Sequence, residues 1–91
     1  MFKMLIQSDS EKIKREGKYN IKEFNSILRN ACLDSEFKES SPGHYYLPEG
    51  SNELGAMFLL EVQFRNLGYI IPNLSKWITW SDREGEVNEL A

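Results

Sequence analysis

Signals for strands and helices follow one another along this chain in an order that limits its folds more than any other feature. They occur as strand, helix, strand, strand, helix, strand within 91 residues, which leaves no room for a linker or a second domain. This order is typical of a two-layer α+β sandwich, in which two helices cover one face of an antiparallel sheet. We therefore predict a single domain over residues 1–91 with the element order βαββαβ.

Periodicity and capping predict the first strand and the first helix. Apolar residues alternate with others over residues 2–7, and a period of two predicts a strand with one buried face. Residues 8–18 are polar, and we interpret them mainly as a connection, because Gly17 would stop a helical turn there. Asn20 can cap the next helix, and Glu23 completes a capping-box pattern. A helix is thus expected over about residues 21–33.

A hairpin is predicted in the middle of the chain. Residues 36–40 indicate a short strand, and residues 44–47 indicate a second strand that is rich in aromatic side chains. The turn between them falls at residues 41–43, because Pro42 presets one backbone dihedral angle and Gly43 admits a positive one.

Residues 53–67 fit two patterns. Apolar side chains occupy every second position over much of the segment, as in a strand, and they also recur at helical steps of three and four. We favour the helix, because an unbroken strand of this length is unusual. Ser51 or Asn52 can cap its start, and Gly68 stands where a helix needs a left-handed residue to end. The strand alternative would give a mostly antiparallel sheet with one helix.

The C-terminal part predicts a last strand with an interruption. Residues 69–71 indicate an apolar strand start, residues 72–73 interrupt it, and residues 76–81 resume the extended pattern. Residues 82–85 have the composition of a turn. Residues 86–90 indicate either a frayed tail or a short edge strand.

Charge narrows the class of partner. The formal net charge is -3, and the acidic excess lies in the C-terminal half. A general nucleic-acid binder is expected to carry a basic stripe, which supplies most of its non-specific affinity. The one basic cluster along the sequence is interrupted by acidic residues and indicates a solvated loop; it consists of Lys12, Lys14, Arg15 and Lys18. Charge therefore favours a protein partner or a homodimer over nucleic acid.

Cys32 is the only cysteine, so an intramolecular disulfide and a two-cysteine zinc half-site are both impossible. A reducing, cytoplasmic location fits this composition. The N-terminus lacks the apolar core of a secretory signal, and no apolar stretch approaches the roughly 18 residues of a membrane-spanning helix. We expect a soluble cytoplasmic protein that uses no cofactor or metal and does not enter a membrane.

No complete catalytic or metal-binding motif occurs in the sequence. His44 follows the predicted turn without a second ligand at local spacing, so we interpret it as an exposed turn residue. Cys32 lies on the apolar face near the end of the first helix, where the helix dipole opposes a thiolate, and is expected in the core. Asp9 follows the first strand; it can bind a divalent cation there, or it can serve ordinary turn chemistry with Ser8 and Ser10.

Four aromatic residues in the predicted strands are candidates for binding. Side chains alternate between the two faces of a strand, so one residue of each neighbouring pair must point away from the helices. Outward aromatic side chains can stack on bases or anchor a protein interface, and they can also simply cover an edge of the core. The acidic surroundings favour a protein partner. The candidates are Tyr45, Tyr46, Trp77 and Trp80, with Ile78 and Trp80 on the face opposite to Trp77 and Thr79.

Parts of the chain resemble the virulence-associated protein D family, relatives of the CRISPR-associated protein 2 nucleases. The similar segments are the short Met-aromatic first strand, residues 19–29, residues 43–46 and residues 80–82. The resemblance implies a ferredoxin-like fold and a dimeric, metal-dependent ribonuclease whose key acid ends the first strand. Gln7 stands near that position in this sequence, and Asp9 lies two residues later.

Two functional hypotheses follow from the residues, besides a ferredoxin-like small-molecule sensor with its ligand between helices and sheet, which no sequence feature supports specifically. The first is a small acidic interaction module of a bacterial kind, such as an immunity, antitoxin or inhibitor protein or an accessory protein of a mobile element. It would bury the aromatic candidates against a basic partner, steered by Asp82, Glu84 and Glu86. The alternative is a homodimeric endoribonuclease in which paired Asp9 side chains bind a cation. Since the sequence lacks a complete active site, we favour the first, non-enzymatic hypothesis.

Overall fold

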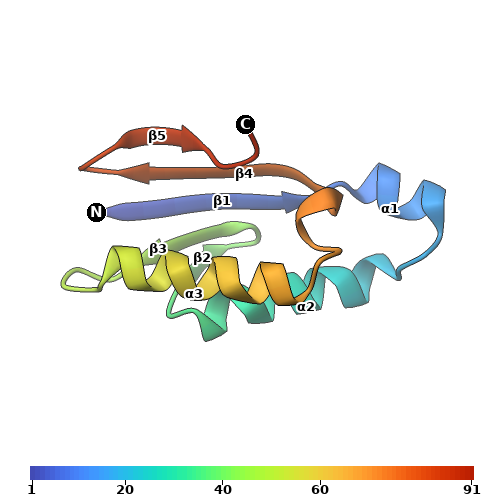
Figure 1. Ribbon diagram of the computed structural model, residues 1–91, viewed down its shortest axis with the longest axis horizontal. Coiled ribbons are helices and arrows are strands. Elements are labelled where there is room, and N and C mark those ends of the chain that lie inside the picture. Colours follow the sequence, from blue (N-terminus) through green and yellow to red (C-terminus); the bar gives the residue numbers. More distant parts are fainter.

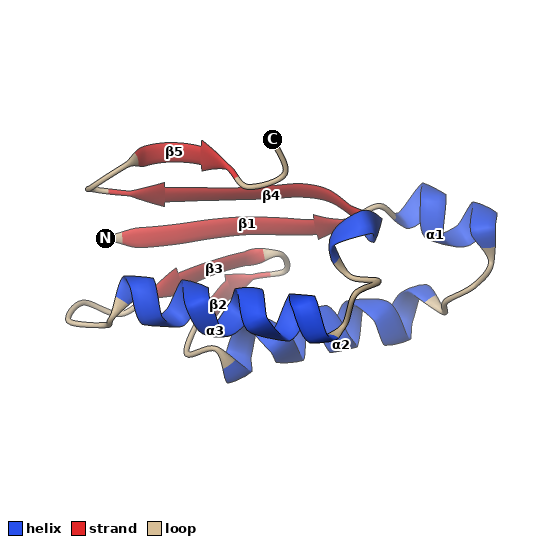
Figure 2. Ribbon diagram, viewed as in Figure 1, coloured by secondary structure: helices blue, strands red, loops and turns tan.

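The centre of the fold, in a computed structural model that describes residues 1–91, is a five-stranded antiparallel sheet in the order β2-β3-β1-β4-β5. Helices α2 and α3 lie on one side of this sheet, and α1 lies beyond the end of β1 (Figures 1 and 2). The strands are β1 (Phe2–Ser8), β2 (Lys38–Ser41), β3 (His44–Leu47), β4 (Leu74–Ser81) and β5 (Gly85–Asn88). The helices are α1 (Ser10–Glu16), α2 (Ile21–Asp34) and α3 (Glu53–Asn66), followed by a 3-10 turn at Ile71–Asn73.

The α+β class and the antiparallel sheet are as predicted, but α1 was not predicted. Residues 8–18 were interpreted mainly as a connection, and that interpretation is wrong. The Asp9 carboxylate caps α1 by accepting a hydrogen bond from the Lys12 backbone N–H at 3.1 Å. Ile13 is buried and anchors the helix, and Gly17 ends it in a left-handed conformation with φ of 68°. One apolar anchor and two good caps therefore suffice for a short helix that is otherwise polar.

The predicted first helix and hairpin are confirmed. The Asn20 side chain accepts hydrogen bonds from the N–H groups of Lys22 and Glu23 at 2.9 and 3.2 Å, which starts α2 where the capping pattern indicated. In the β2–β3 turn, Gly43 has a φ of 81°, and a Cβ atom there would lie 3.0 Å from the Ile6 carbonyl oxygen. Glycine is thus needed both for the turn and for the close approach of β1.

Residues 53–66 form helix α3, as favoured over the strand, and Asn52 caps it through a 2.9 Å hydrogen bond from the Gly55 N–H. The predicted role of Gly68 is wrong, because this residue has no positive φ. The chain instead leaves α3 at Leu67, whose N–H donates to the Gln63 carbonyl oxygen at 2.9 Å.

The predicted strand start at residues 69–71 is also wrong. The Ile70 and Asn73 N–H groups donate to the carbonyl oxygens of Leu67 and Ile70, so this segment is wound as tight turns. Pro72 lies at the start of the 3-10 turn, where its missing N–H is harmless. The strand β4 accordingly begins only at Leu74, and the C-terminal segment forms the edge strand β5 rather than a frayed tail.

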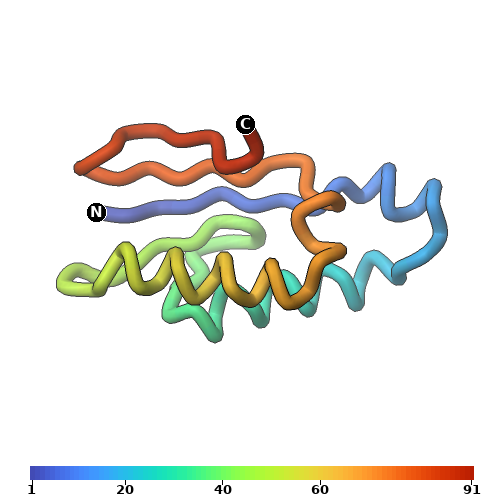
Figure 3. The backbone as a smooth tube through the Cα atoms, viewed as in Figure 1, coloured from blue at the N-terminus to red at the C-terminus, as the bar shows by residue number.

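The hydrophobic core lies between the sheet and the helices α2 and α3. Strand β1 runs through the middle of the sheet between β3 and β4, and α2 and α3 run along the same side of that sheet (Figure 3). The core comprises 17 buried residues; the main contributions are Phe2, Met4 and Ile6 from β1, Phe24 and Leu28 from α2, and Ala56, Leu60 and Phe64 from α3. Because side chains alternate along each strand, the opposite face of the sheet is left without a covering layer.

Candidate functional site

The uncovered face of the sheet, called here the open face, carries exposed aromatic side chains. Lys3 on β1 is paired on one side with Tyr46 of β3 and on the other with Trp80 of β4. The two rings therefore flank a lysine, two strand spacings or about 10 Å apart. Tyr46 is 39 % exposed, and Trp80 is partly exposed.

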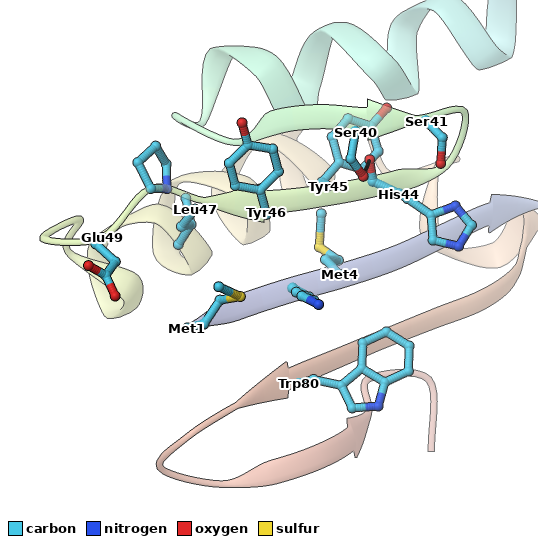
Figure 4. Close-up of a pocket in the computed structure, with 12 residues that line it drawn as sticks. Met1, Met4, Ser40, Ser41, His44, Tyr45, Tyr46, Leu47, Glu49 and Trp80 are labelled. Atoms are coloured by element: carbon cyan, nitrogen blue, oxygen red, sulfur yellow. Dashed lines mark hydrogen bonds between the residues drawn. The ribbon is translucent and has the colours of Figure 1, made fainter.

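The open face contains a shallow depression of about 840 Å³. Figure 4 shows His44 and Tyr46 on β3 and Trp80 on β4, with β1 passing between them. The indole N–H of Trp80 donates to the Glu86 carboxylate of β5 at 2.8 Å, which orients the ring. Nδ1 of His44 lies 3.3 Å from the Pro42 carbonyl oxygen, a contact within the exposed turn.

The other two aromatic candidates, Tyr45 and Trp77, lie on the helix side of the sheet. Each is 4 % exposed. The Trp77 ring packs edge-on against Phe64 at 5.1 Å, and its N–H donates to the Met4 sulfur at 3.3 Å. The sequence thus predicts correctly that one residue of each pair points away from the helices. The structure leaves Tyr46 and Trp80 as the aromatic residues of the open face.

Helix α3 presents a second surface that the sequence interpretation did not identify. Leu54, Phe58 and Leu59 are 64 %, 62 % and 44 % exposed, although Ala56, Leu60 and Phe64 on the same helix are buried. We call Leu54, Phe58 and Leu59 the α3 apolar patch. Its signal in the sequence was the coexistence of strand and helix patterns, since a helix that is apolar on all sides fits both. Such a helix normally has its outer face covered.

An acidic groove borders the α3 apolar patch on the side of β4 and β5. Its apolar lining comes from Phe2, Leu54 and Met57. Four carboxylates and one guanidinium surround this lining; they belong to Glu53, Glu61, Glu84, Glu89 and Arg83. Glu89 accepts a 2.7 Å hydrogen bond from the Thr79 hydroxyl, but none of the four carboxylates takes part in either of the two ion pairs of the molecule. The groove therefore combines an apolar lining with excess negative charge.

Asp9, Cys32 and His44 do not come together. Asp9 caps α1, as ordinary turn chemistry requires, and His44 lies on the exposed turn beside β3. Cys32 is fully buried, and burial raises the pKa of its thiol to about 12, so it is not a thiolate at neutral pH. No group of three or more His, Cys, Asp or Glu side chains is arranged to hold a metal ion.

Comparisons with known proteins return no match, whether among protein-family models, curated proteins or solved structures. None of the helices is both long enough and apolar enough to cross a membrane.

Proposed function

We propose that this protein is a small interaction module that binds a basic segment of another protein along α3 and the acidic groove. The single observation that carries the proposal is the α3 apolar patch. Soluble domains seldom leave contiguous large apolar side chains on one helix face unless that face binds something. Phe58, in the middle of the patch, has the aromatic character of an interface anchor.

The charge of the groove supports a basic partner. Carboxylates without ion partners line one side of the patch, and a partner that carries Lys or Arg would satisfy them while its apolar side chains cover Phe58. A second copy of this chain fits less well, because a two-fold interface joins the same acidic surface of both copies and supplies no excess of basic groups for the groove carboxylates. An immunity, antitoxin or inhibitor-like role of a bacterial kind suits such a module.

We further propose that the fold is a ferredoxin-like domain with two additions. Without the edge strand β5, the remaining four strands lie in the order β2-β3-β1-β4, and the elements without α1 and β5 follow the order βαββαβ. This arrangement is consistent with the resemblance to the virulence-associated protein D family. It carries no support for the endoribonuclease alternative, since the fold is used by proteins of many functions.

Affinity capture followed by reconstitution tests the function. Proteins captured by the wild-type chain are purified, and their affinities for the wild type and for each variant are measured by calorimetry. We expect Phe58→Ala to weaken binding by about 30-fold, the loss typical of an interface hot spot, and Glu61→Gln to weaken it less. Tyr46→Ala, on the opposite face, is the control and should bind as the wild type does.

Two outcomes would contradict the proposal. The first is a partner whose affinity is lost with Tyr46→Ala and kept with Phe58→Ala, since the partner would then use the open face. The second is a wild-type dimer in light scattering that Phe58→Asp converts to a monomer, since a second copy would then cover α3.

A further inference from the structure

The open face has a charge opposite to that of the acidic groove. Lys38 of β2, Tyr46 of β3, Lys3 of β1, Trp80 of β4 and Glu86 of β5 follow one another in one row across the sheet. We infer that the open face is a further binding site, separate from α3, and that it takes single-stranded nucleic acid. This site goes beyond the proposed protein-binding function and does not depend on it.

Lysines on this face are free to meet phosphate groups. Lys3 and Lys38 lie in the aromatic row, and Lys76 of β4 is paired with Gln7, whose side chain is on the same face. All three lysines are exposed, and none belongs to an ion pair. Phosphate contacts by lysine supply most of the sequence-independent affinity of nucleic-acid binders. The carboxylates beside these three lysines are Glu86 in the row and Glu49 at the rim of the depression, so the face has a small positive charge on a protein whose net charge is negative.

Aromatic side chains on the same face match unpaired bases. Tyr46 and Trp80 stand on either side of Lys3, about 10 Å apart, so each ring can stack with one base while the lysine meets the backbone between them. Bases in a duplex are stacked on each other and hidden from a flat sheet. This geometry therefore favours a single strand over a duplex.

Glu86 disfavours phosphate groups at one edge of the open face. It is the only carboxylate on the strand positions of the open face, and it holds the Trp80 indole through the 2.8 Å hydrogen bond. Its negative charge repels phosphate from the β5 edge. The phosphate backbone is therefore expected near Lys3 and Lys38 rather than near β5.

Other occupants fit the face less well. A second copy stacked face to face would bring three lysines against three lysines, with only Glu86 and Glu49 from each copy to offset them. An acidic protein would match the charge, but it would not repeat flat rings and anionic groups along its chain as a single strand of nucleic acid does. The sequence alone disfavoured nucleic acid because the three lysines are far apart along the chain; only the strand register brings them to one face.

Fluorescence anisotropy tests the inference on the full chain. The probes are fluorescein-labelled oligouridine and oligothymidine of about 12 nucleotides, within the usual span of single-strand sites, and a duplex of the same length. We expect dissociation constants on the order of 10 to 100 μM at about 50 mM salt, with weaker binding of the duplex. Raising the salt to about 200 mM should weaken single-strand binding about 20-fold, as three released counterions require.

Matched variants distinguish base stacking on the open face from non-specific binding elsewhere on the protein. Trp80→Ala and Tyr46→Ala should each weaken binding about tenfold, while Trp80→Phe keeps most of the affinity. Tyr19→Ala is the control, because Tyr19 is 39 % exposed like Tyr46 but stacks on Tyr69 at the helix side of the molecule. Lys3→Gln should reduce the salt dependence, whereas Lys22→Gln on α2 should not. Circular dichroism verifies that each variant is folded.

Three results would overturn the inference. One is no binding of either oligonucleotide at about 100 μM protein and low salt. Another is equal weakening by Tyr19→Ala and Trp80→Ala, since binding would then not use the open face. The third is a wild-type dimer that Trp80→Ala dissociates, since a second copy would then occupy the site.

Discussion

Phe58 and Phe64 offer a direct test of how α3 is used. They are the same residue type on the same helix, but Phe58 is 62 % exposed and Phe64 is 1 % exposed. Phe64 packs edge-on against Trp77 at 5.1 Å within the core. If Phe58 serves binding and Phe64 serves folding, then Phe58→Ala should lower the affinity for the partner with little loss of stability. Phe64→Ala should mainly lower the free energy of unfolding.

The size of each effect follows from burial. Phe64→Ala removes a fully buried aromatic ring and should lower the free energy of unfolding by about 3–5 kcal/mol. Full burial of a large apolar side chain contributes about 1.5–3 kcal/mol, so the smaller covered fraction of Phe58 limits the cost of Phe58→Ala to about 1 kcal/mol. In a domain of this size, about 1 kcal/mol corresponds to roughly 4–8 °C in the midpoint of thermal unfolding.

Urea unfolding, followed by circular dichroism and by tryptophan fluorescence, measures both changes. The buried Trp77 beside Phe64 reports directly on the core. A loss above about 2 kcal/mol for Phe58→Ala would refute the argument, because Phe58 would then be packed in the folded state. An unfolding midpoint that rises with protein concentration would show that a second copy provides this packing.

Two further predictions concern residues outside both surfaces. Burial raises the pKa of the Cys32 thiol from its ordinary value of 9.0 to about 12, so the folded state holds a proton that the unfolded chain releases as the pH rises. The free energy of unfolding should not depend on this group below pH 9 and should fall between pH 9 and 12, less steeply in Cys32→Ala. Urea unfolding at several pH values measures this change, and a free energy of unfolding that is independent of pH would contradict the prediction. Asp9→Ala should cost about 1 kcal/mol through loss of the α1 cap, whereas Asp9→Asn keeps the cap and should cost little. Cleavage of RNA with Mg²⁺ or Mn²⁺ by the wild type, but not by Asp9→Asn, would instead support the endoribonuclease alternative.

Local signals in the sequence were reliable where neighbouring residues determine the structure. The Asn20 cap and the Pro42-Gly43 turn act over three or four residues, so the start of α2 and the hairpin could be predicted. Helix α1 was missed because, although its caps are local, the contacts that anchor it come from far along the chain. Its Ile13 side chain is buried by tertiary packing, and the Lys12 ammonium donates to the Pro72 carbonyl oxygen at 2.6 Å.

The two candidate surfaces likewise depend on tertiary packing, which local sequence signals do not specify. Strand alternation predicts that Tyr46 and Tyr45 point to opposite faces, but only the packing of the helices decides which of them is buried. The α3 apolar patch escaped notice because apolar residues at helical spacing are normally core residues. Their exposure depends on the width of the sheet face that α3 covers, which no local pattern specifies.

The net charge of -3 is a poor guide to partners of this molecule, because it sums two surfaces of opposite sign. At physiological salt the Debye length is about 8 Å, so a ligand on the open face experiences mainly Lys3, Lys38, Lys76 and Glu86 rather than the carboxylates of the groove. A ligand in the groove beside α3 likewise experiences mainly the four groove carboxylates, which Arg83 offsets in part. The sheet separates these groups, since the lysines occupy strand positions directed away from the core that α3 covers. An overall negative charge therefore slows the approach of a polyanion from a distance without removing its local attraction to the open face.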